Sequence, residues 1–191
     1  MKFSAPLRRF AGAIAVALGL AFAAPVAAQD KPKASQPVLV TSLGQSLDAF
    51  QVQLAVRRAG IKFKYDPHAE VDQLDGVKTM FLAVGASLKG FGDAGITIKD
   101  ELARAGHLLD AAKSRGILIV VLHMGGEERR DALSNQLIEL TAPRAQRLII
   151  REDSDPDGLF AKIAKDNKIP LAVVDNVTNL KQPLQDLFAG S

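Results

Sequence analysis

Side chains able to bind a small anion follow three of the apolar segments in this 191-residue sequence. Residues 41–48 carry hydroxyls, residues 85–95 carry glycines with a serine and a lysine, and residues 123–130 carry a histidine, two glutamates and two arginines. Hydroxyl donors, cations and helix N-termini are groups with which proteins bind carboxylates and phosphates. The predicted ligand is therefore a small anion such as a carboxylate. The predicted ligand-binding residues are Ser42, Gln45, Ser46, Ser87, Lys89, His123, Glu127, Arg129 and Arg130.

Two adjacent arginines, Arg129 and Arg130, are expected to begin a helix. Positive charge at a helix N-terminus opposes the helix dipole. An anion, or a neighbour such as Glu127, would offset that conflict. Two alternatives stay open, because the arginines can also point to solvent or pair with Asp131 and Glu152. Successive helix positions differ by about 100°, so one arginine is expected to face inward rather than both.

His123 is expected at the carboxyl end of a strand, whereas His68 falls in a turn and His107 on the solvent side of a helix. It is interpreted either as a structural side chain held by hydrogen bonds or as a group that contacts the ligand. An alternative function is a periplasmic enzyme in which His123 acts as acid or base with Ser87 or Asp48. Another alternative is a docking module whose glycine-rich loops bind a membrane or periplasmic partner protein.

Three glycine-rich patterns come close to known motifs without completing them. Residues 90–95 fit G-x-G-x-x-G, but they follow the third strand candidate instead of the first and end before the next helix. Residues 85–90 have the spacing of a phosphate loop, with Phe91 in place of its lysine. Residues 85–89 resemble a nucleophile elbow, with Lys89 in place of the final glycine. No cofactor is therefore predicted.

A metal site is not predicted either. One histidine at the expected crevice and scattered carboxylates do not give the clustered ligands that zinc requires. Glu127, Asp153 and Asp155 are the carboxylates that could hold a hard cation.

The segments that must position these loops alternate between strand-like and helix-like patterns, which is typical of βαβ units and a parallel sheet. Strict alternation at 61–65 indicates an edge strand, and solidly apolar runs indicate central strands. We expect a three-layer, doubly wound α/β domain, Rossmann-like or flavodoxin-like, with five or six mostly parallel strands in the order 2-1-3-4-5-6. The ligand crevice of such a sheet lies where the chain reverses direction, between strands one and three. The expected strands are residues 38–41, 61–65, 79–84, 117–122, 147–150 and 170–174.

Helix signals complete this pattern. Ser46 is a plausible N-cap for the first helix, and Thr97 with Asp100 predicts a capping box for another. The segment 85–96 is expected to be a long glycine-rich loop. The expected helices span residues 46–60, 97–115, part of 127–141, 156–167 and 180–188. The core stripe of the second of these consists of Ile98, Leu102, Ala105, Leu109 and Ala112.

Residues 1–28 have the pattern of a cleavable signal peptide, with a basic stretch, an apolar run at 10–24 and small residues at 26–28. Residues 29–36 are expected to be a disordered leader, and residues 37–191 a single α/β domain. The mature protein is therefore expected to be periplasmic or secreted and soluble after cleavage. A membrane transporter is a conceivable partner.

Charge and cysteine content argue against further kinds of binding site and covalent modification. The chain has 24 Lys and Arg against 21 Asp and Glu, and residues 1–28 hold three of the basic residues and no acidic one. The remaining chain is formally neutral and has one Tyr and no Trp, which argues against nucleic-acid binding. The absence of cysteine excludes disulfides and a lipid-modified N-terminal cysteine.

Three motifs together resemble a known family. They are Thr-Ser-x-Gly-Gln-Ser at 41–46, Gly-x-Ser-x-Lys-Gly-x-Gly-x-Ala-Gly-Ile at 85–96 and His-x-Gly-Gly-Glu-x-Arg-Arg at 123–130. With the signal peptide, they are similar to exported bacterial proteins classified as domain of unknown function 6305, from about residue 37 to 188. The resemblance implies export and one compact domain, and it implies no particular activity.

Overall fold

Six strands form one parallel sheet in the computed structural model, which describes Met1 and residues 33–189. Their spatial order is β2-β1-β3-β4-β5-β6, so the predicted strand order and the doubly wound α/β class are confirmed. The chain reverses direction between β1 and β3, which are paired in register from Val38 opposite Thr79 to Leu43 opposite Val84. The strands are β1 Val38–Leu43, β2 Phe63–Tyr65, β3 Thr79–Val84, β4 Leu118–His123, β5 Arg147–Arg151 and β6 Leu171–Val174.

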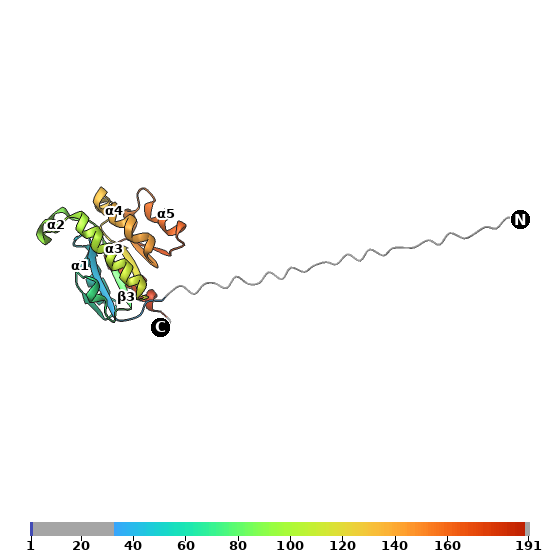
Figure 1. Ribbon diagram of the computed structural model, residues 1–191, viewed down its shortest axis with the longest axis horizontal. Coiled ribbons are helices and arrows are strands. Elements are labelled where there is room, and N and C mark those ends of the chain that lie inside the picture. Colours follow the sequence, from blue (N-terminus) through green and yellow to red (C-terminus); the bar gives the residue numbers. More distant parts are fainter. Residues whose placement is uncertain (2–32, 190–191) are drawn as a thin grey trace. The chain divides into compact units, whose positions relative to one another are not determined.

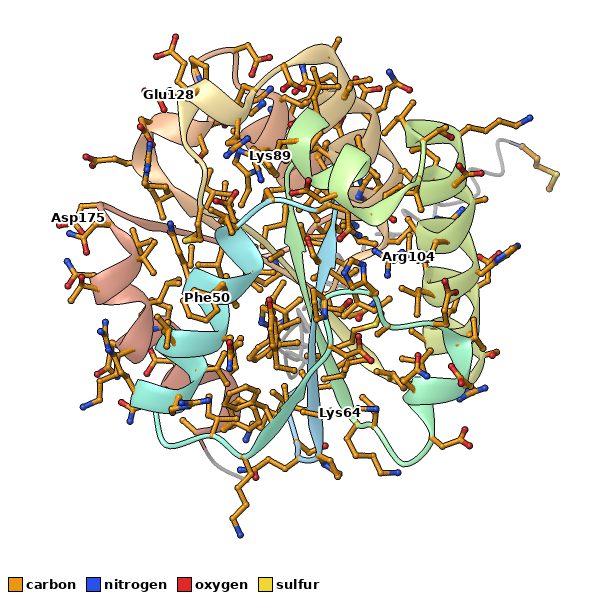
Figure 2. All side chains as sticks on the ribbon, turned by 90° about the vertical axis from the view of Figure 1, so that its left-hand side faces the viewer. Phe50, Lys64, Lys89, Arg104, Glu128 and Asp175 are labelled. Atoms are coloured by element: carbon orange, nitrogen blue, oxygen red, sulfur yellow. The ribbon has the colours of Figure 1, made fainter. Side chains whose placement is uncertain are left out.

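Helices cover both faces of the sheet (Figure 1). Buried residues of α3, α4 and α5 pack on one face, and those of α1 and α6 pack on the other. Figure 2 shows this layering, with Phe50 of α1 on one side of the strands and Arg104 of α3 on the other. The helices are α1 Asp48–Arg58, α2 Leu88–Ala94, α3 Ile98–Ser114, α4 Ala132–Thr141, α5 Leu159–Asp166 and α6 Lys181–Phe188.

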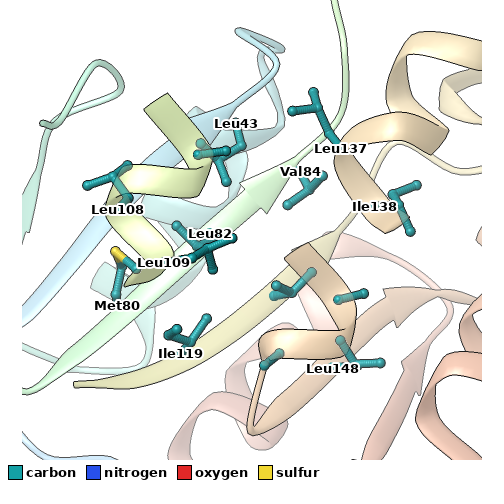
Figure 3. Packing of buried hydrophobic residues seen from close by; sticks show 14 of the residues in the cluster. Leu43, Met80, Leu82, Val84, Leu108, Leu109, Ile119, Leu137, Ile138 and Leu148 are labelled. Carbon is teal, nitrogen blue, oxygen red and sulfur yellow. The ribbon is translucent and has the colours of Figure 1, made fainter. Parts of the chain in front are cut away.

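Three of the four inner strands, β1, β3 and β4, are buried along their whole length, as their apolar sequences predict. Their side chains alternate between two apolar layers, and Figure 3 shows one layer, in which Leu82 and Val84 meet Leu109 and Leu137. The edge strand β2 exposes Lys64 between two half-buried aromatic residues. A lysine on an edge strand opposes pairing with other chains.

The predicted loop 85–96 is wrong in its middle, where α2 forms. Ser87 caps this helix by accepting a hydrogen bond from the Gly90 N–H (3.1 Å), and Gly95 ends it in the left-handed conformation (φ 66°). Helix α1 begins two residues later than predicted, because Leu47 and not Ser46 is its N-cap. The Ser46 hydroxyl still accepts a hydrogen bond from the first helical amide, that of Asp48 (3.3 Å).

The helix after β4 also begins later than predicted, so Arg129 and Arg130 do not start it. Its N-cap is Asp131, whose carboxylate accepts a hydrogen bond from the Ser134 N–H (2.7 Å). An acidic residue therefore occupies the positive end of the helix dipole, and the expected conflict with two arginines does not arise. Arg129 ends a short 3-10 turn, Glu127–Arg129, and Arg130 follows it.

The N-terminal border of the domain lies earlier than the predicted leader 29–36 suggests. Ala34 is buried and donates its N–H to the Leu187 carbonyl (2.8 Å), and Ser35 exchanges hydrogen bonds with the Thr79 hydroxyl (2.8 and 3.0 Å). Residues 33–36 thus pack on the domain. The predicted signal peptide, apart from Met1, and residues 29–32 lie outside the described residues. Within residues 33–189, no helix is long and apolar enough to cross a membrane.

Candidate functional site

Two loops meet at the carboxyl ends of β1 and β3, where the fold predicts a crevice. The Gly44 carbonyl accepts a hydrogen bond from the Ser87 N–H (2.8 Å), and Gln45 forms an antiparallel bridge with Ala86. Gly44 has φ +106°, and a Cβ there would clash with the Gly85 carbonyl. Glycine is therefore required at this contact, and the two loops are bound to each other.

A buried ion pair below the crevice holds the loop after β1. Glu101 of α3 accepts hydrogen bonds from the Gly44 N–H (2.6 Å) and from the Gln45 amide (3.0 Å). Arg104 binds both Glu101 oxygens at 2.7 Å and also the carbonyls of Ser42 (2.5 Å) and Ala69 (2.7 Å). Gln45 has a positive φ of 59°, which is uncommon for a residue other than glycine. This network explains how the loop keeps that conformation.

Asp48, at the start of α1, lies where the loops after β3 and β4 approach the loop after β1. The residue is 5% exposed, and its Oδ2 atom has no hydrogen-bond partner in the described part of the chain. A Cβ built on Gly85 would stand 3.1 Å from Asp48 Oδ2 and 3.4 Å from Ser46 Oγ, and one built on Gly125 would stand 2.9 Å from Asp48 Oδ2. The carboxylate therefore faces two glycine backbones, one after β3 and one after β4.

His123, the last residue of β4, is completely buried beside this carboxylate. Its Nδ1 lies 2.7 Å from the Val84 carbonyl, so in the neutral ring this nitrogen carries the proton and Nε2 is the acceptor. Nε2 has no hydrogen-bond partner among residues 33–189. Burial lowers the pKa of His123, although the Val84 carbonyl, Asp48 and the nearby Gly126 backbone oppose the shift. One ring nitrogen therefore has the structural role that the sequence suggested, and ligand contact through the other stays a prediction.

Two predicted cations form ion pairs with carboxylates of the scaffold. Arg130 contacts both oxygens of Asp157 (2.9 Å each) and lies 5.4 Å above the Phe160 ring, and its side chain is 4% exposed. Lys89 pairs with Asp93 one helical turn away (2.8 Å), and its side chain is 87% exposed. An exposed pair of this kind contributes little. The prediction that Lys89 and Arg130 bind ligand is therefore not supported by their contacts.

Arg129 remains as the predicted cation at the crevice. Its guanidinium donates to the Ala86 carbonyl (3.2 Å), its aliphatic part lies against Gly125, and it forms no ion pair within residues 33–189. The sequence reasoning missed a second arginine, Arg151 of β5, which lies against Gly126. The hydrogen-bonded Asp153 carboxylate raises the pKa of Arg151. Its position at a strand's carboxyl end was the signal that could have identified it.

The other predicted residues have defined roles. The Gln45 amide is bound to Glu101, and the Ser87 hydroxyl caps α2. The described chain has no hydrogen bond between Ser87 and His123. The Ser42 hydroxyl is buried without a hydrogen-bond partner in the described chain. Glu127 lies in the 3-10 turn after β4.

Two of the carboxylates that were considered as ligands of a hard cation bind other groups of the protein. Asp153 binds Arg151 through both oxygens (2.5 and 2.6 Å), and Asp155 accepts hydrogen bonds from the Phe160 and Ala161 amides at the start of α5 (2.8 and 2.9 Å). Residues 33–189 contain no group of three or more metal-ligating side chains.

Strand order and the position of the crevice define a doubly wound, flavodoxin-like α/β domain. The chain belongs to the family described as Domain of unknown function (DUF6305), whose model matches residues 35–188. No match was found among curated proteins.

Two crystal structures from Bacteroides thetaiotaomicron are weakly similar. A protein assigned as protease I is 10% identical with a TM-score of 0.38, over 78% of this chain and 97% of its own. A GDSL-like lipase is 11% identical with a TM-score of 0.35, over 71% of this chain and 66% of its own. Likenesses this weak do not indicate a shared activity.

Proposed function

We propose that this protein is an exported small-molecule-binding domain whose ligand carries an anionic group such as a carboxylate. The ligand lies in the crevice at the carboxyl ends of β1, β3 and β4. Export is proposed from the signal-peptide pattern of residues 1–28. The observation that carries the proposal is a pair of buried polar atoms at this end of the sheet, Asp48 Oδ2 and His123 Nε2, that have no hydrogen-bond partners in the described chain.

Buried polar atoms of this kind are costly in a scaffold. A buried group that lacks a hydrogen bond costs about 1–3 kcal/mol, and native folds have few such groups. A ligand that hydrogen-bonds to both atoms offsets this cost. Arg129 supports the anionic part of the proposal, because it is half-buried at the crevice and no carboxylate within residues 33–189 neutralises it.

A thermal-shift screen of the purified protein tests the proposal. The probes are acetate, succinate, citrate, phosphate and sulfate, and a ligand at one hundred times its dissociation constant adds about 2.7 kcal/mol of stability. Arg129→Gln should abolish the response. The matched control is Arg144→Gln, which removes the exposed pair with Asp110 on α3. If no probe stabilises the protein, or if both variants respond like the wild type, the anionic-ligand proposal is wrong.

Acid–base catalysis is the second candidate, and the hydrogen bonding of His123 favours it. The Val84 carbonyl fixes the ring so that Nε2, near Asp48, can take a proton from a bound substrate and return it. Asp48 is the favoured partner, since its charge acts on His123, whereas the Ser87 hydroxyl has only its contact with the Gly90 N–H of α2 in the described chain. His123→Asn should abolish turnover of any panel compound, followed by NMR, while its binding remains. Binding without turnover in the wild type would exclude catalysis of the compounds tested.

A further inference from the structure

The proposed crevice contains both hydrogen-bond acceptors and a group that only donates. The inference drawn from this contrast rests on the proposed function and makes its ligand more specific. Asp48 Oδ2 and His123 Nε2 are hydrogen-bond acceptors on buried side chains. Arg129, which only donates, lies beside them on the loop that follows β4. A simple anion satisfies the arginine and leaves the two acceptors unsatisfied.

The unpartnered acceptors lie together against the backbone of Gly85. The position of a Cβ on Gly85 is 3.1 Å from Asp48 Oδ2, 3.4 Å from Ser46 Oγ and 3.9 Å from His123 Cε1. Two oxygen atoms and the imidazole ring thus converge on this face of the glycine. A ligand group that serves these acceptors donates several hydrogens.

The cation lies close to the carboxylate without neutralising it. Arg129 packs its aliphatic part against Gly125, and Asp48 Oδ2 lies 2.9 Å from the Cβ position of the same glycine. No ion pair joins Arg129 to Asp48, because the guanidinium turns to the Ala86 carbonyl. Two neighbouring, unpaired charges of opposite sign match a ligand with the complementary arrangement.

We propose that the ligand is an amino carboxylate, whose ammonium group binds Asp48 and Ser46 beside Gly85 and whose carboxylate binds Arg129. The ammonium offsets the buried charge of Asp48, which a hydroxyl cannot do, and one of its hydrogens can reach His123 Nε2. Each of the four groups then has a partner.

Calorimetric titration with two matched series tests this assignment. The series are propionate, lactate and alanine, and succinate, malate and aspartate, which differ only in one hydrogen, hydroxyl or ammonium group. The purified protein should bind the amino compound at least about tenfold more tightly than the unsubstituted acid, with the hydroxy acid between them. Asp48→Asn should remove the preference. Asp93→Asn, which breaks only the exposed pair with Lys89, should retain it.

A second variant covers the case in which Asp48→Asn fails to fold. Gly85→Ala places a methyl group in the space beside Asp48, at a backbone conformation for which no left-handed φ is required. It should weaken binding of the amino compounds more than that of the unsubstituted acids, whereas Gly92→Ala, with open space around it, should change neither.

The outcomes separate the two proposals. If succinate and aspartate bind equally well, or if the preference survives both Asp48→Asn and Gly85→Ala, the amino-carboxylate assignment is overturned while the anion-binding proposal stands. If none of the six compounds binds, the amino-carboxylate assignment is overturned, and the anion-binding proposal is overturned as well when citrate, phosphate and sulfate also fail to stabilise the protein.

Discussion

Two buried carboxylates lie at the same end of the sheet, and their surroundings differ. Glu101 is fully buried and receives hydrogen bonds from Gly44, Gln45 and Arg104. Asp48 is almost as buried, yet one of its oxygens has no partner in the described chain. Folding alone accounts for the position of Glu101, which fixes a loop. The position of Asp48 is what the proposed ligand would explain.

Removing Arg104, the partner of Glu101, should give the largest loss of unfolding free energy. Arg104→Met leaves a buried charge unpaired, and breaking such a pair costs roughly 3–5 kcal/mol. Urea denaturation measures the loss. The double variant E101Q/R104M should recover part of it, and the exposed pair variant Arg144→Gln should lose less than about 1 kcal/mol. A loss in Arg104→Met as small as that of Arg144→Gln would show that the pair does not hold the loop.

A substitution in the loop held by Glu101 should lower the unfolding free energy almost as much. Gly44→Ala introduces a Cβ that clashes with the Gly85 carbonyl at φ +106°, so we expect a loss of about 2–3 kcal/mol by thermal or urea unfolding. Gly60→Ala is the matched control, since its φ is also positive (76°) but its surroundings are open. Equal losses in the two variants would place the cost in the φ angle alone and not in the contact between loops.

Substitution of the unpartnered carboxylate should raise the unfolding free energy, whereas the two preceding substitutions lower it. Asp48→Asn removes a buried charge, so we expect the ligand-free protein to gain up to about 1 kcal/mol of unfolding free energy. Glu101→Gln, the matched change at the satisfied carboxylate, should destabilise. A destabilised Asp48→Asn would mean that the protein itself satisfies this carboxylate.

The histidine next to Asp48 should make stability depend on pH. Burial lowers the pKa of His123 below the ordinary histidine value of 6.5, so the unfolded chain takes up the proton first as the pH falls. Stability is then full above about pH 6.5 and decreases as the pH falls toward the folded-state pKa. His123→Asn, which keeps an N–H donor for the Val84 carbonyl, should lose this dependence. An unchanged pH profile in the variant would assign the dependence to other groups.

The strand order, the edge position of β2 and the place of His123 could be predicted because they depend on local patterns of apolar residues. The roles of Glu101 and Arg104 could not, because the apolar stripe predicted for α3 omits both, and only the fold brings Ser42 and Ala69 to them. An acidic and a basic residue three positions apart beside that stripe were the available signal.

Tertiary contacts also determine which of the two adjacent arginines is held in an ion pair. Arg130 was indistinguishable from Arg129 in the sequence, and its anchoring depends on Asp157 and Phe160, more than twenty residues away. The proposed ligand is inferred from charges that the fold leaves unpaired, and no sequence motif identifies these charges.

The adjacent arginines after β4 have a thermodynamic consequence for the crevice. Arg130 ties this loop to α5 through Asp157, while Arg129, one peptide bond away, lies over the crevice. A ligand that draws Arg129 inward would act on this tie through the shared backbone. If the proposed ligand does so, its affinity and the local opening of α5 are reciprocally coupled, and hydrogen exchange in α5, whose Phe160 ring lies 5.4 Å from that of His123, should report occupancy of the site.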